Sequence, residues 1–450
     1  MSSHKHPHQS SSTEADLSDS VSEVDASEYA GVRNTSFAWP SRHRLHFFLL
    51  WIVSGANYLA YAATGLALTL FATHLTRVPL LVSGIAFVQI LPAFVLGLPL
   101  GVLVDRYDRR LILIVTTALR VSAFALDACL ASVDFVPLPL LYALALLLGV
   151  TETIEEPALA AALVMVVPRE KLERANALLV GAQNIFGLLA DPLGAFLVSI
   201  SIVLSLGASS LCAGLALLAL LCLRQTLRLP SRNGRERATR RGTLLRHIGM
   251  DIREGLRYLW HERLLLAIAV MAGIINACWS GYLVVMALYA VAPGPLGLSA
   301  ATYGVLLMVI SIGSILGTLL TAPVQRWLGR RWAIGFNVFG NGLMFVTPAL
   351  THNLWLIGAA LLLGSMGGPM WTIAVAALQG RLIPAGLQGR VNATCRLLSI
   401  GMAALGPLAA GLLAQFCGLR TVLILFALVT GLQFIPFFRF VTEDAMMRGQ

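Results

Sequence analysis

The sequence contains little charge, and its second half contains no acidic residue over a very long stretch. Only 12% of its 450 residues are Asp, Glu, Lys or Arg, whereas soluble globular domains contain about a quarter. Between Arg263 and Thr442 there is no Asp or Glu at all. Because a water-exposed surface of this length needs charge of both signs, the sequence excludes a cytosolic enzyme, a secreted disulfide-bonded domain and a nucleic-acid-binding protein.

Metal-binding and catalytic motifs are missing as well. The six cysteines have no CxxC spacing and lie mostly in apolar runs, so we interpret them as packing residues and predict no metal site. There is no GxGxxG, HExxH or phosphate-binding loop. We therefore predict that the protein is not an enzyme and uses no cofactor.

Long apolar segments make up most of the chain. Hydrophobic residues account for 57% of it, and a helix of about 20 apolar residues crosses a hydrocarbon core about 30 Å thick. Apolar runs and breakers predict twelve spans. They lie at roughly 45–71, 80–104, 110–132, 138–166, 173–198, 202–224, 263–290, 299–322, 332–350, 354–380, 390–414 and 419–441. The predicted fold class is all-α integral membrane.

The chain also repeats itself. Arg174 and Asn176 correspond to Arg390 and Asn392, which lie 216 positions later, and the flanking sequences match in the same way. Internal repeats of this kind build secondary transporters, so we predict two pseudo-symmetric six-helix bundles around a central cavity. The predicted parts are a disordered tail (1–44), the first bundle (45–224), a basic linker (225–262), the second bundle (263–441) and a short tail (442–450).

The basic residues predict the orientation in the membrane. If the N-terminus lies inside, all but three of the 32 Lys and Arg residues lie on the inner side of the membrane. Arg77 and Arg420 lie outside, and Arg120 lies within a span. The excess of basic residues in cytoplasmic loops predicts that both termini are cytoplasmic in a cell membrane, which we take to be a bacterial inner membrane.

One inner loop carries a recognisable signature. The segment GVLVDRYDRRLIL, from Gly101 to Leu113, resembles the pattern G-x-L-x-D-R-x-x-R-R of the major facilitator superfamily. It departs at Asp108, where many members have Gly, and the second-half counterpart has Thr321 in place of the acid. The segments GVTETIEEPALAAALVMVVPREKLERANAL and GRVNATCRLL further resemble the drug:proton antiporter branch, which includes macrolide-efflux and enterobactin-exporting members.

The resemblance implies a gating role for this signature. Its acid and arginines would hold the two halves together on the inner side when the cavity opens outward. Gly97 and Gly101 are one turn apart, which predicts the close approach of a neighbouring helix. The alternative is that these charges only set the orientation in the membrane. That would explain the arginines but not the acid among them. The predicted gating residues are Gly97, Gly101, Asp105, Arg106, Arg109 and Arg110.

Several charged residues fall inside the predicted spans, where each costs about 2.5–3.5 kcal/mol on insertion scales. The candidates for proton coupling are Arg120, Asp127, Glu152, Glu155, Glu156 and Asp191, and all belong to the first half. The three glutamates are crowded on one helix, so they cannot all ionise and at least one is expected to hold a proton. Arg120 is expected to pair with one of them or with Asp127. A purely structural ion-pair network is the alternative.

Aromatic, amide and methionine side chains predict the lining of the cavity. The candidates are Asn57, Tyr61, Gln183, Asn276, Trp279, Tyr282, Met370 and Trp371, most of them on helices that line the cavity in the resembling family. Such side chains suit a bulky amphipathic ligand. Ordinary helix packing is the alternative for each of them.

Together these features predict a monomeric, proton-coupled exporter of bulky amphipathic organic compounds. Its partners would be a small organic substrate, protons and the lipid bilayer, with no nucleic acid. A nutrient:proton symporter and a lysolipid flippase remain open, because direction and substrate are not written in the sequence. A non-transporting membrane scaffold or sensor is the alternative from another class.

Overall fold

The computed structural model describes residues 41–132, 137–168, 171–223, 250, 253–384 and 386–442, although a few side chains within these segments, including those of residues 101–103, 105 and 106, are not described. The first half contains α2 (Ser41–Leu75), α3 (Pro79–Arg106), α4 (Arg109–Ser132), α5 (Leu138–Val166), α6 (Leu172–Ile200) and α7 (Ile202–Cys222). The second half contains α10 (Arg263–Ala290), α11 (Ala300–Leu328), α12 (Arg330–Leu350), α13 (Leu354–Leu382), α14 (Gln388–Cys417), α15 (Leu419–Leu432) and α16 (Phe434–Phe440).

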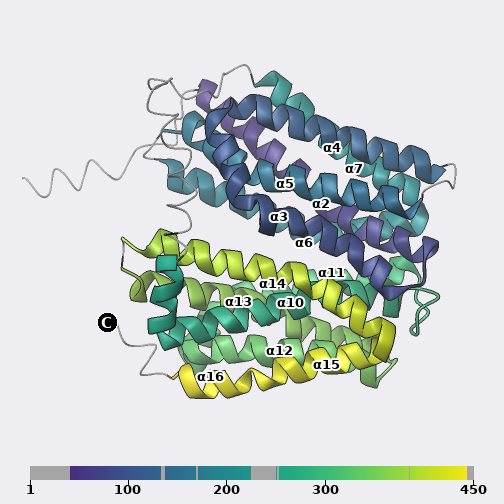
Figure 1. Cartoon of the computed structure of the whole chain (residues 1–450), viewed down its shortest axis with the longest axis vertical. Coiled ribbons are helices and arrows are strands. Elements are labelled where there is room, and N and C mark those ends of the chain that lie inside the picture. Colours follow the sequence, from purple (N-terminus) through teal and green to yellow (C-terminus); the bar gives the residue numbers. More distant parts are fainter. Residues whose placement is uncertain are drawn as a thin grey trace, which may run out of the picture. The chain divides into compact units, whose positions relative to one another are not determined.

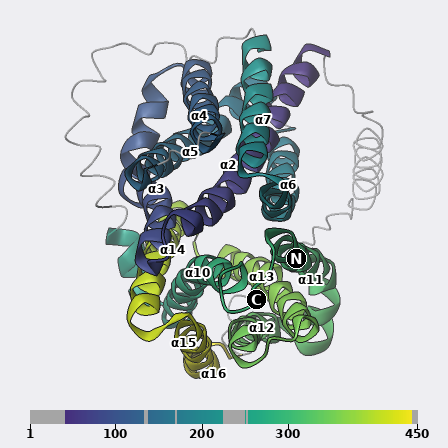
Figure 2. The ribbon, with the colours of Figure 1, turned by 90° about the vertical axis from the view of Figure 1, so that its right-hand side faces the viewer.

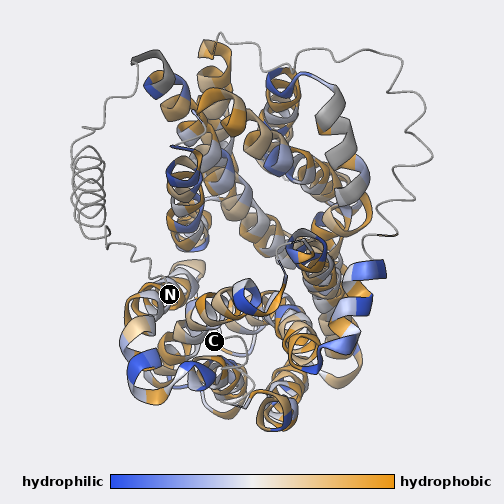
Figure 3. Ribbon diagram, turned by 90° about the vertical axis from the view of Figure 1, so that its left-hand side faces the viewer, coloured by the Kyte–Doolittle hydropathy of each residue, from blue (hydrophilic) through white to orange (hydrophobic). Residues whose placement is uncertain are grey.

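The described residues confirm the predicted fold class. They contain twelve helices that are long and apolar enough to cross a membrane. The last of these spans is interrupted near Gln433, where α15 ends and α16 begins. Figure 3 shows apolar ribbon along most of each helix and hydrophilic stretches at several helix ends. Residues 1–40 of the predicted tail and most of the predicted linker 225–262 lie outside the described residues, whereas residues 41–44 of the predicted tail are helical as the start of α2.

The chain separates into two units, Met1–Phe48 and Leu49–Gln450, and the second unit contains both bundles. In the first half α3 packs on α5 and α4 packs on α7, and in the second half α10 packs on α14 and α12 on α13. The halves meet where α3 lies beside α14 and α6 beside α11 (Figures 1 and 2).

Glycines allow the halves to approach closely at one end. We call this end the far side, and the opposite end, which carries helix 253–261, the linker side. An added Cβ at Gly411 of α14 would lie only 2.8 Å from the Ser83 Cβ of α3, and one at Gly304 of α11 would lie 3.0 Å from the Ala195 Cβ of α6. A Cβ at Gly411 would force its neighbours to shift and one at Gly304 would be tighter than an ordinary contact, so both positions favour glycine. The structure is therefore closed on the far side.

Two of the prolines inside the helices are matched by serines on neighbouring helices. A proline has no N–H to bond the carbonyl four residues earlier, and in a membrane that carbonyl needs another donor. Pro192 of α6 and Pro407 of α14, which correspond in the repeat after a one-residue slip, each free one carbonyl. The donors are Ser311 Oγ to the Leu188 carbonyl across the halves, and Ser280 Oγ to the Ala403 carbonyl at 2.8 Å within the second half.

The end of the linker forms a short helix, 253–261, that packs on the second half. The Tyr258 hydroxyl donates to the Leu382 carbonyl at 2.8 Å, and Arg390 pairs with Glu254 at 2.7 Å. These contacts hold the last part of the linker against α13 and α14.

Candidate transport cavity and its charged residues

Arg120 of α4 is the centre of a buried charged network. Its side chain is 0% exposed and forms ion pairs with two carboxylates of α5, with Glu152 at 3.0 Å and with Glu155 at 2.7 Å. Residues three apart on a helix share a face, so both glutamates point at the same guanidinium group. The prediction that Arg120 pairs with the glutamate cluster is confirmed.

Amide and hydroxyl groups complete this network. The Asn57 amide of α2 donates to Glu155 Oε1 at 2.6 Å and to Thr117 Oγ1 at 3.1 Å. The Arg120 guanidinium also lies 5.8 Å from the centre of the Tyr61 ring. We call Arg120, Glu152, Glu155, Asn57 and Thr117 the Arg120 network.

The two glutamates of the network differ in their access to solvent. The Glu155 side chain is 6% exposed, whereas that of Glu152 is 28% exposed. One guanidinium group cannot neutralise two carboxylates in a nearly dry site. Two carboxylates therefore share one guanidinium group, and Glu152 is the one of the two with more access to solvent.

Glu156 takes a different partner from its two neighbours. It forms an ion pair with Arg396 of α14, so the pair joins the first half to the second. The side chains of Glu156 and Arg396 are 55% and 61% exposed. Exposed pairs contribute only about 0–1 kcal/mol, so this contact can break and form readily.

A cavity of about 570 Å³ lies between the halves at this point. We call it the charged cavity because Glu152, Glu156 and Arg396 line it, together with Tyr61, Gln89 and Gly97. Its walls come from α2, α3, α5 and α14. Glu152 of the Arg120 network and the ion pair between the halves therefore face the same space.

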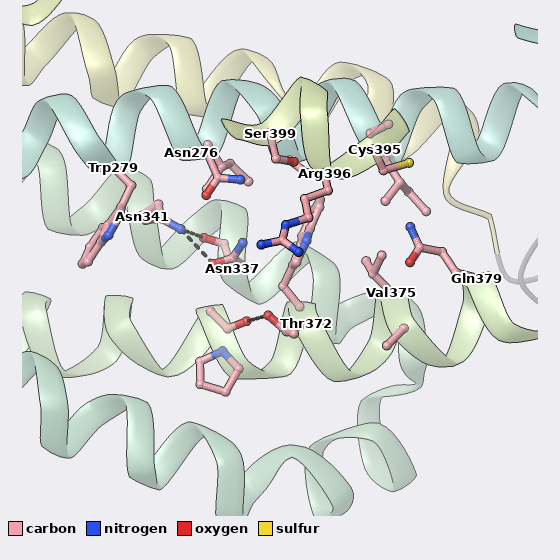
Figure 4. A pocket seen from close by; sticks show the side chains of 18 of the residues that line it. Asn276, Trp279, Asn337, Asn341, Thr372, Val375, Gln379, Cys395, Arg396 and Ser399 are labelled. Carbon is pink, nitrogen blue, oxygen red and sulfur yellow. Dashed lines mark hydrogen bonds between the residues drawn. The ribbon is translucent and has the colours of Figure 1, made fainter. Parts of the chain in front are cut away.

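A second cavity, of about 490 Å³, extends into the second half and shares Arg396 with the charged cavity (Figure 4). We call it the amide cavity, because five amide side chains line it. They are Asn276, Asn337, Asn341, Gln379 and Asn392. The Asn341 amide donates to both the backbone and the side-chain oxygen of Asn337 at 2.8 Å. Trp279 and Trp371 provide apolar walls.

A third, smaller cavity of about 220 Å³ lies nearer the far side. Asp191 and Tyr303 line it, and it shares Tyr61 and Gln89 with the charged cavity. The three cavities therefore adjoin one another along the contact between the halves.

The structure brings together half of the predicted cavity residues. Tyr61, Asn276, Trp279 and Trp371 do line the cavities. Asn57 instead belongs to the Arg120 network. Tyr282 and Met370 line none of these three cavities: they are 0% exposed and pack in hydrophobic clusters, because their helix faces point into the second bundle. Gln183 is half-buried on α6 and lines none of the three cavities.

Asp127 is placed apart from the other acids. Its side chain is buried, and neither carboxylate oxygen has a hydrogen-bond partner among the described residues. It lies two turns from Arg120 on α4, but the guanidinium group turns to α5 instead. The alternative that Arg120 pairs with Asp127 is wrong.

The gating signature is described only in part. The surroundings of Gly101 and the side chains of Asp105 and Arg106 are not described. Arg109 is buried at the start of α4, and Arg110 donates to the Leu221 carbonyl of α7 at 3.3 Å.

The packing role predicted for Gly97 is wrong in this state. No atom lies within 4 Å of the position of an added Cβ there, because the charged cavity occupies the space beside it. Its repeat counterpart Gly313, by contrast, contacts the Leu362 carbonyl of α13 closely.

Sequence reasoning missed Arg396 and most of the amides. The predicted span 390–414 put Arg396 near a membrane boundary, but α14 begins at Gln388 and carries it two turns inside the helix. Asn337 and Asn341 are four residues apart on α12, and this spacing is the signal that could have identified them.

Comparison with known structures supports the same architecture. A nucleoside transporter, NupG, is 13% identical with a TM-score of 0.67, and the match covers 88% of this chain and 100% of that one. A bacterial homologue of the iron transporter ferroportin in an inward-facing state is 16% identical, with a TM-score of 0.66 and coverage of 89% and 99%. A POT family transporter in complex with 5-aminolevulinic acid is 11% identical, with a TM-score of 0.67 and coverage of 89% and 96%.

These likenesses show the fold alone. No curated protein matches the sequence. The family model described as Major Facilitator Superfamily matches residues 50–393, which is more than half of the chain. Together with the twelve apolar helices, this match makes the protein a multi-pass membrane transporter. The chain belongs to the major facilitator superfamily.

Proposed function

We propose that this transporter is a proton-coupled exporter of bulky amphipathic organic compounds that works as a monomer by alternating access. In this proposal it lies in the cell membrane with both termini in the cytoplasm, so the linker side is the cytoplasmic side. The observation that carries the proposal is that Glu152, held by buried Arg120, lines the same cavity as the exposed pair of Glu156 and Arg396.

The Arg120 network suits a proton carrier. When Glu152 is ionised the network has one more negative than positive charge, and a net charge is costly in a low-dielectric site. A proton on Glu152 leaves the pair of Arg120 and Glu155, which is neutral. The halves would rock more easily when Glu152 is protonated. Moving a neutral centre from a water-filled cavity to a dry one costs less free energy than moving a charged one.

The remaining predicted residues are assigned to gating and to secondary sites. Asp105 and Arg106 would close the linker side after the far side has opened, as the resemblance of their segment implies. Asp191 lines the third cavity, nearer the far side, and would relay the proton on that side.

A proton:substrate symporter is the second candidate, and one observation favours it. When Glu156 is ionised, its carboxylate pairs with Arg396, which is then not available to a substrate. A proton on Glu156 would release Arg396 for an anionic substrate, so the proton and the substrate would bind together. Joint binding leads to transport in the same direction, whereas an antiporter needs the two to exclude each other.

The first experiment compares drug and metabolite accumulation in cells with and without the gene, with a protonophore as control. An exporter lowers accumulation of its substrate until the protonophore is added. A symporter raises it under the same conditions. Equal accumulation for every compound contradicts both candidates and favours a lysolipid flippase, or a scaffold or sensor without transport.

The second experiment uses the compound identified in this way and purified protein in liposomes. Glu152→Gln removes the exchangeable proton, so we expect uptake driven by a pH gradient to fall at least tenfold while exchange of substrate across equal pH persists. Glu173→Gln, an exposed carboxylate at the start of α6, is the matched control and should behave as wild type. Full pH-driven transport by Glu152→Gln would contradict the role of Glu152.

A further inference from the structure

The amide cavity has an unusual charge balance. Among its described lining residues Arg396 is the one charged side chain, and no acid lines it because no Asp or Glu occurs between Arg263 and Thr442. The other polar lining groups are neutral amides and hydroxyls, which can donate as well as accept. The cavity therefore has one positive charge, which is paired with Glu156 in this state, and has no carboxylate of its own for a cationic ligand.

We propose that the amide cavity binds the anionic group of the substrate, a carboxylate or a phosphate ester on an aromatic or amphipathic body, and that Arg396 is its direct partner. Glu156 is the carboxylate of the protein itself that occupies Arg396 until the substrate displaces it. This inference rests on the proposed transport function, names its substrate class as organic anions, and fits the symporter candidate, in which a proton on Glu156 releases Arg396, more directly than the antiporter.

The contact between Arg396 and Glu156 shows how Arg396 would bind the carboxylate of a substrate. One terminal nitrogen of Arg396 bonds both carboxylate oxygens of Glu156, so the guanidinium group already holds a carboxylate at the mouth of the cavity. Arg is the side chain best suited to planar carboxylate and phosphate groups. Since both partners are more than half exposed, replacing one carboxylate by another costs little.

The walls of the cavity suit the rest of such a molecule. Trp279 and Trp371 offer apolar faces, while Asn337 and Asn341 form a hydrogen-bonded amide pair on α12 (Figure 4). A volume of about 490 Å³ lies within the range of roughly 300–1,000 Å³ that is typical of sites for drug-sized ligands. Aromatic carboxylates fit this combination of charge, apolar surface and size.

The carboxylates that could bind a cationic ligand already have partners. The two carboxylates that line the adjoining charged cavity, Glu152 and Glu156, are each already paired with an arginine. A cation would have to displace Arg120 or Arg396, and displacing Arg120 would leave a buried charge without its partners. An anion has only the exposed Glu156 to displace.

The test measures binding by the purified full-length protein, without transport. The probes share one skeleton: 2-naphthoate is anionic, 2-naphthamide is neutral and 2-naphthylmethylammonium is cationic. Binding is followed by tryptophan fluorescence, to which Trp279 and Trp371 of the cavity contribute, and checked by thermal stabilisation. We expect 2-naphthoate to bind at least tenfold more tightly than the other two. Equal or tighter binding of the cation would overturn the proposal.

Two variants should act in opposite directions. Arg396→Gln is expected to weaken naphthoate binding roughly 10- to 100-fold, because it removes a charge-assisted hydrogen bond. Glu156→Gln is expected to tighten it about 2- to 5-fold, because it removes the competing carboxylate. Arg381→Gln, at an exposed arginine in the last turn of α13, is the matched control and should leave binding unchanged. If both variants weaken naphthoate binding equally, Glu156 is not a competitor and the proposal fails.

A last comparison distinguishes two sources of the anion. Lysophosphatidylglycerol replaces 2-naphthoate in the same assay, and tighter binding of this lipid identifies an anionic lysolipid as the substrate. This assay measures binding without a pH gradient, so it tests the preference for anions separately from transport. The protein can show no preference for anions and still transport a substrate by proton coupling. Conversely, a protein that binds naphthoate through Arg396 but transports nothing would contradict only the proposed function.

Discussion

Arg120 and Arg396 both pair with glutamates of α5, but their environments give the two contacts different roles. Arg120 is fully buried, and removing one partner of such a pair costs about 3–5 kcal/mol. Arg396 is exposed, and its pair with Glu156 contributes about 0–1 kcal/mol. In the proposed mechanism Arg120 therefore keeps its pair with Glu155 throughout the cycle, and the weaker pair of Arg396 with Glu156 is exchanged for a ligand.

Asp127 provides a prediction at the scale of a single residue. Its carboxylate is buried without a hydrogen-bond partner among the described residues. Because an unsatisfied buried polar group costs about 1–3 kcal/mol, and a charged one costs more, Asp127→Asn should raise the free energy of unfolding by about 1 kcal/mol. Unfolding in mixed detergent micelles measures this change, with Glu173→Gln as the exposed control.

The same variant tests the role predicted for Asp127 from the sequence. Asp127 lines none of the three cavities, so we expect Asp127→Asn to keep its response to a pH gradient. A variant that is less stable than wild type and no longer responds to the gradient would assign Asp127 to proton coupling after all.

The sequence predicted the charged residues better than it predicted their partners. A charge in an apolar run is costly, and this cost identified Arg120 and the glutamates of α5. The direction of each side chain depends on how the helices rotate against one another, which a single helix does not specify. For this reason Glu156, one turn from Glu152, turned out to face the other half. Arg396 was missed because its helix begins before the apolar run does.

At the scale of helices, the same hydrogen bond occurs twice: a serine hydroxyl bonds a carbonyl that a proline has left without its usual donor. Pro192 and Pro407 stand at matching places of the two halves, and each frees a carbonyl that a serine of a neighbouring helix bonds. The repeat was visible in the sequence, but the serine donors were not, because they lie on other helices. Ser311 joins α11 to α6 and so links the halves, whereas Ser280 acts within the second half.

Ser280 provides the prediction at this scale. Ser280→Ala leaves the Ala403 carbonyl without its donor from α10. Interhelical hydrogen bonds in membranes contribute about 0.6 kcal/mol on average and at most about 1.7 kcal/mol, so we expect a loss of stability in this range. Ser122→Ala is the matched control, because the Ser122 hydroxyl bonds only a carbonyl of its own helix, at Ala118. Equal losses in the two variants, measured by thermal unfolding, would show that the hydrogen bond between helices adds nothing.

At the scale of the whole molecule the two halves have the same fold but different charge. The described acids that line the cavities, Glu152, Glu156 and Asp191, belong to the first half, and Arg396 comes from the second. In the proposed mechanism the first half therefore carries the proton and the second half binds the substrate. The exposed pair of Glu156 and Arg396 is the contact through which one half can sense the state of the other.

Rocking of the halves requires that the far-side contacts break when the linker side closes. Gly411→Val would place a side chain against Ser83 and Leu80 of α3, so it should disfavour the state described here and favour the opposite one. Hydrogen–deuterium exchange measures the shift: exchange should rise in peptides around Leu80 and fall in peptides around Gln388. Gly97→Val is the matched control, since no atom lies within 4 Å of its added Cβ, and far-side exchange should stay as in wild type. If both variants raise far-side exchange alike, the glycine contact does not hold the far side closed, and the closure must come from the Ser311 bond and the other contacts of α6 with α11.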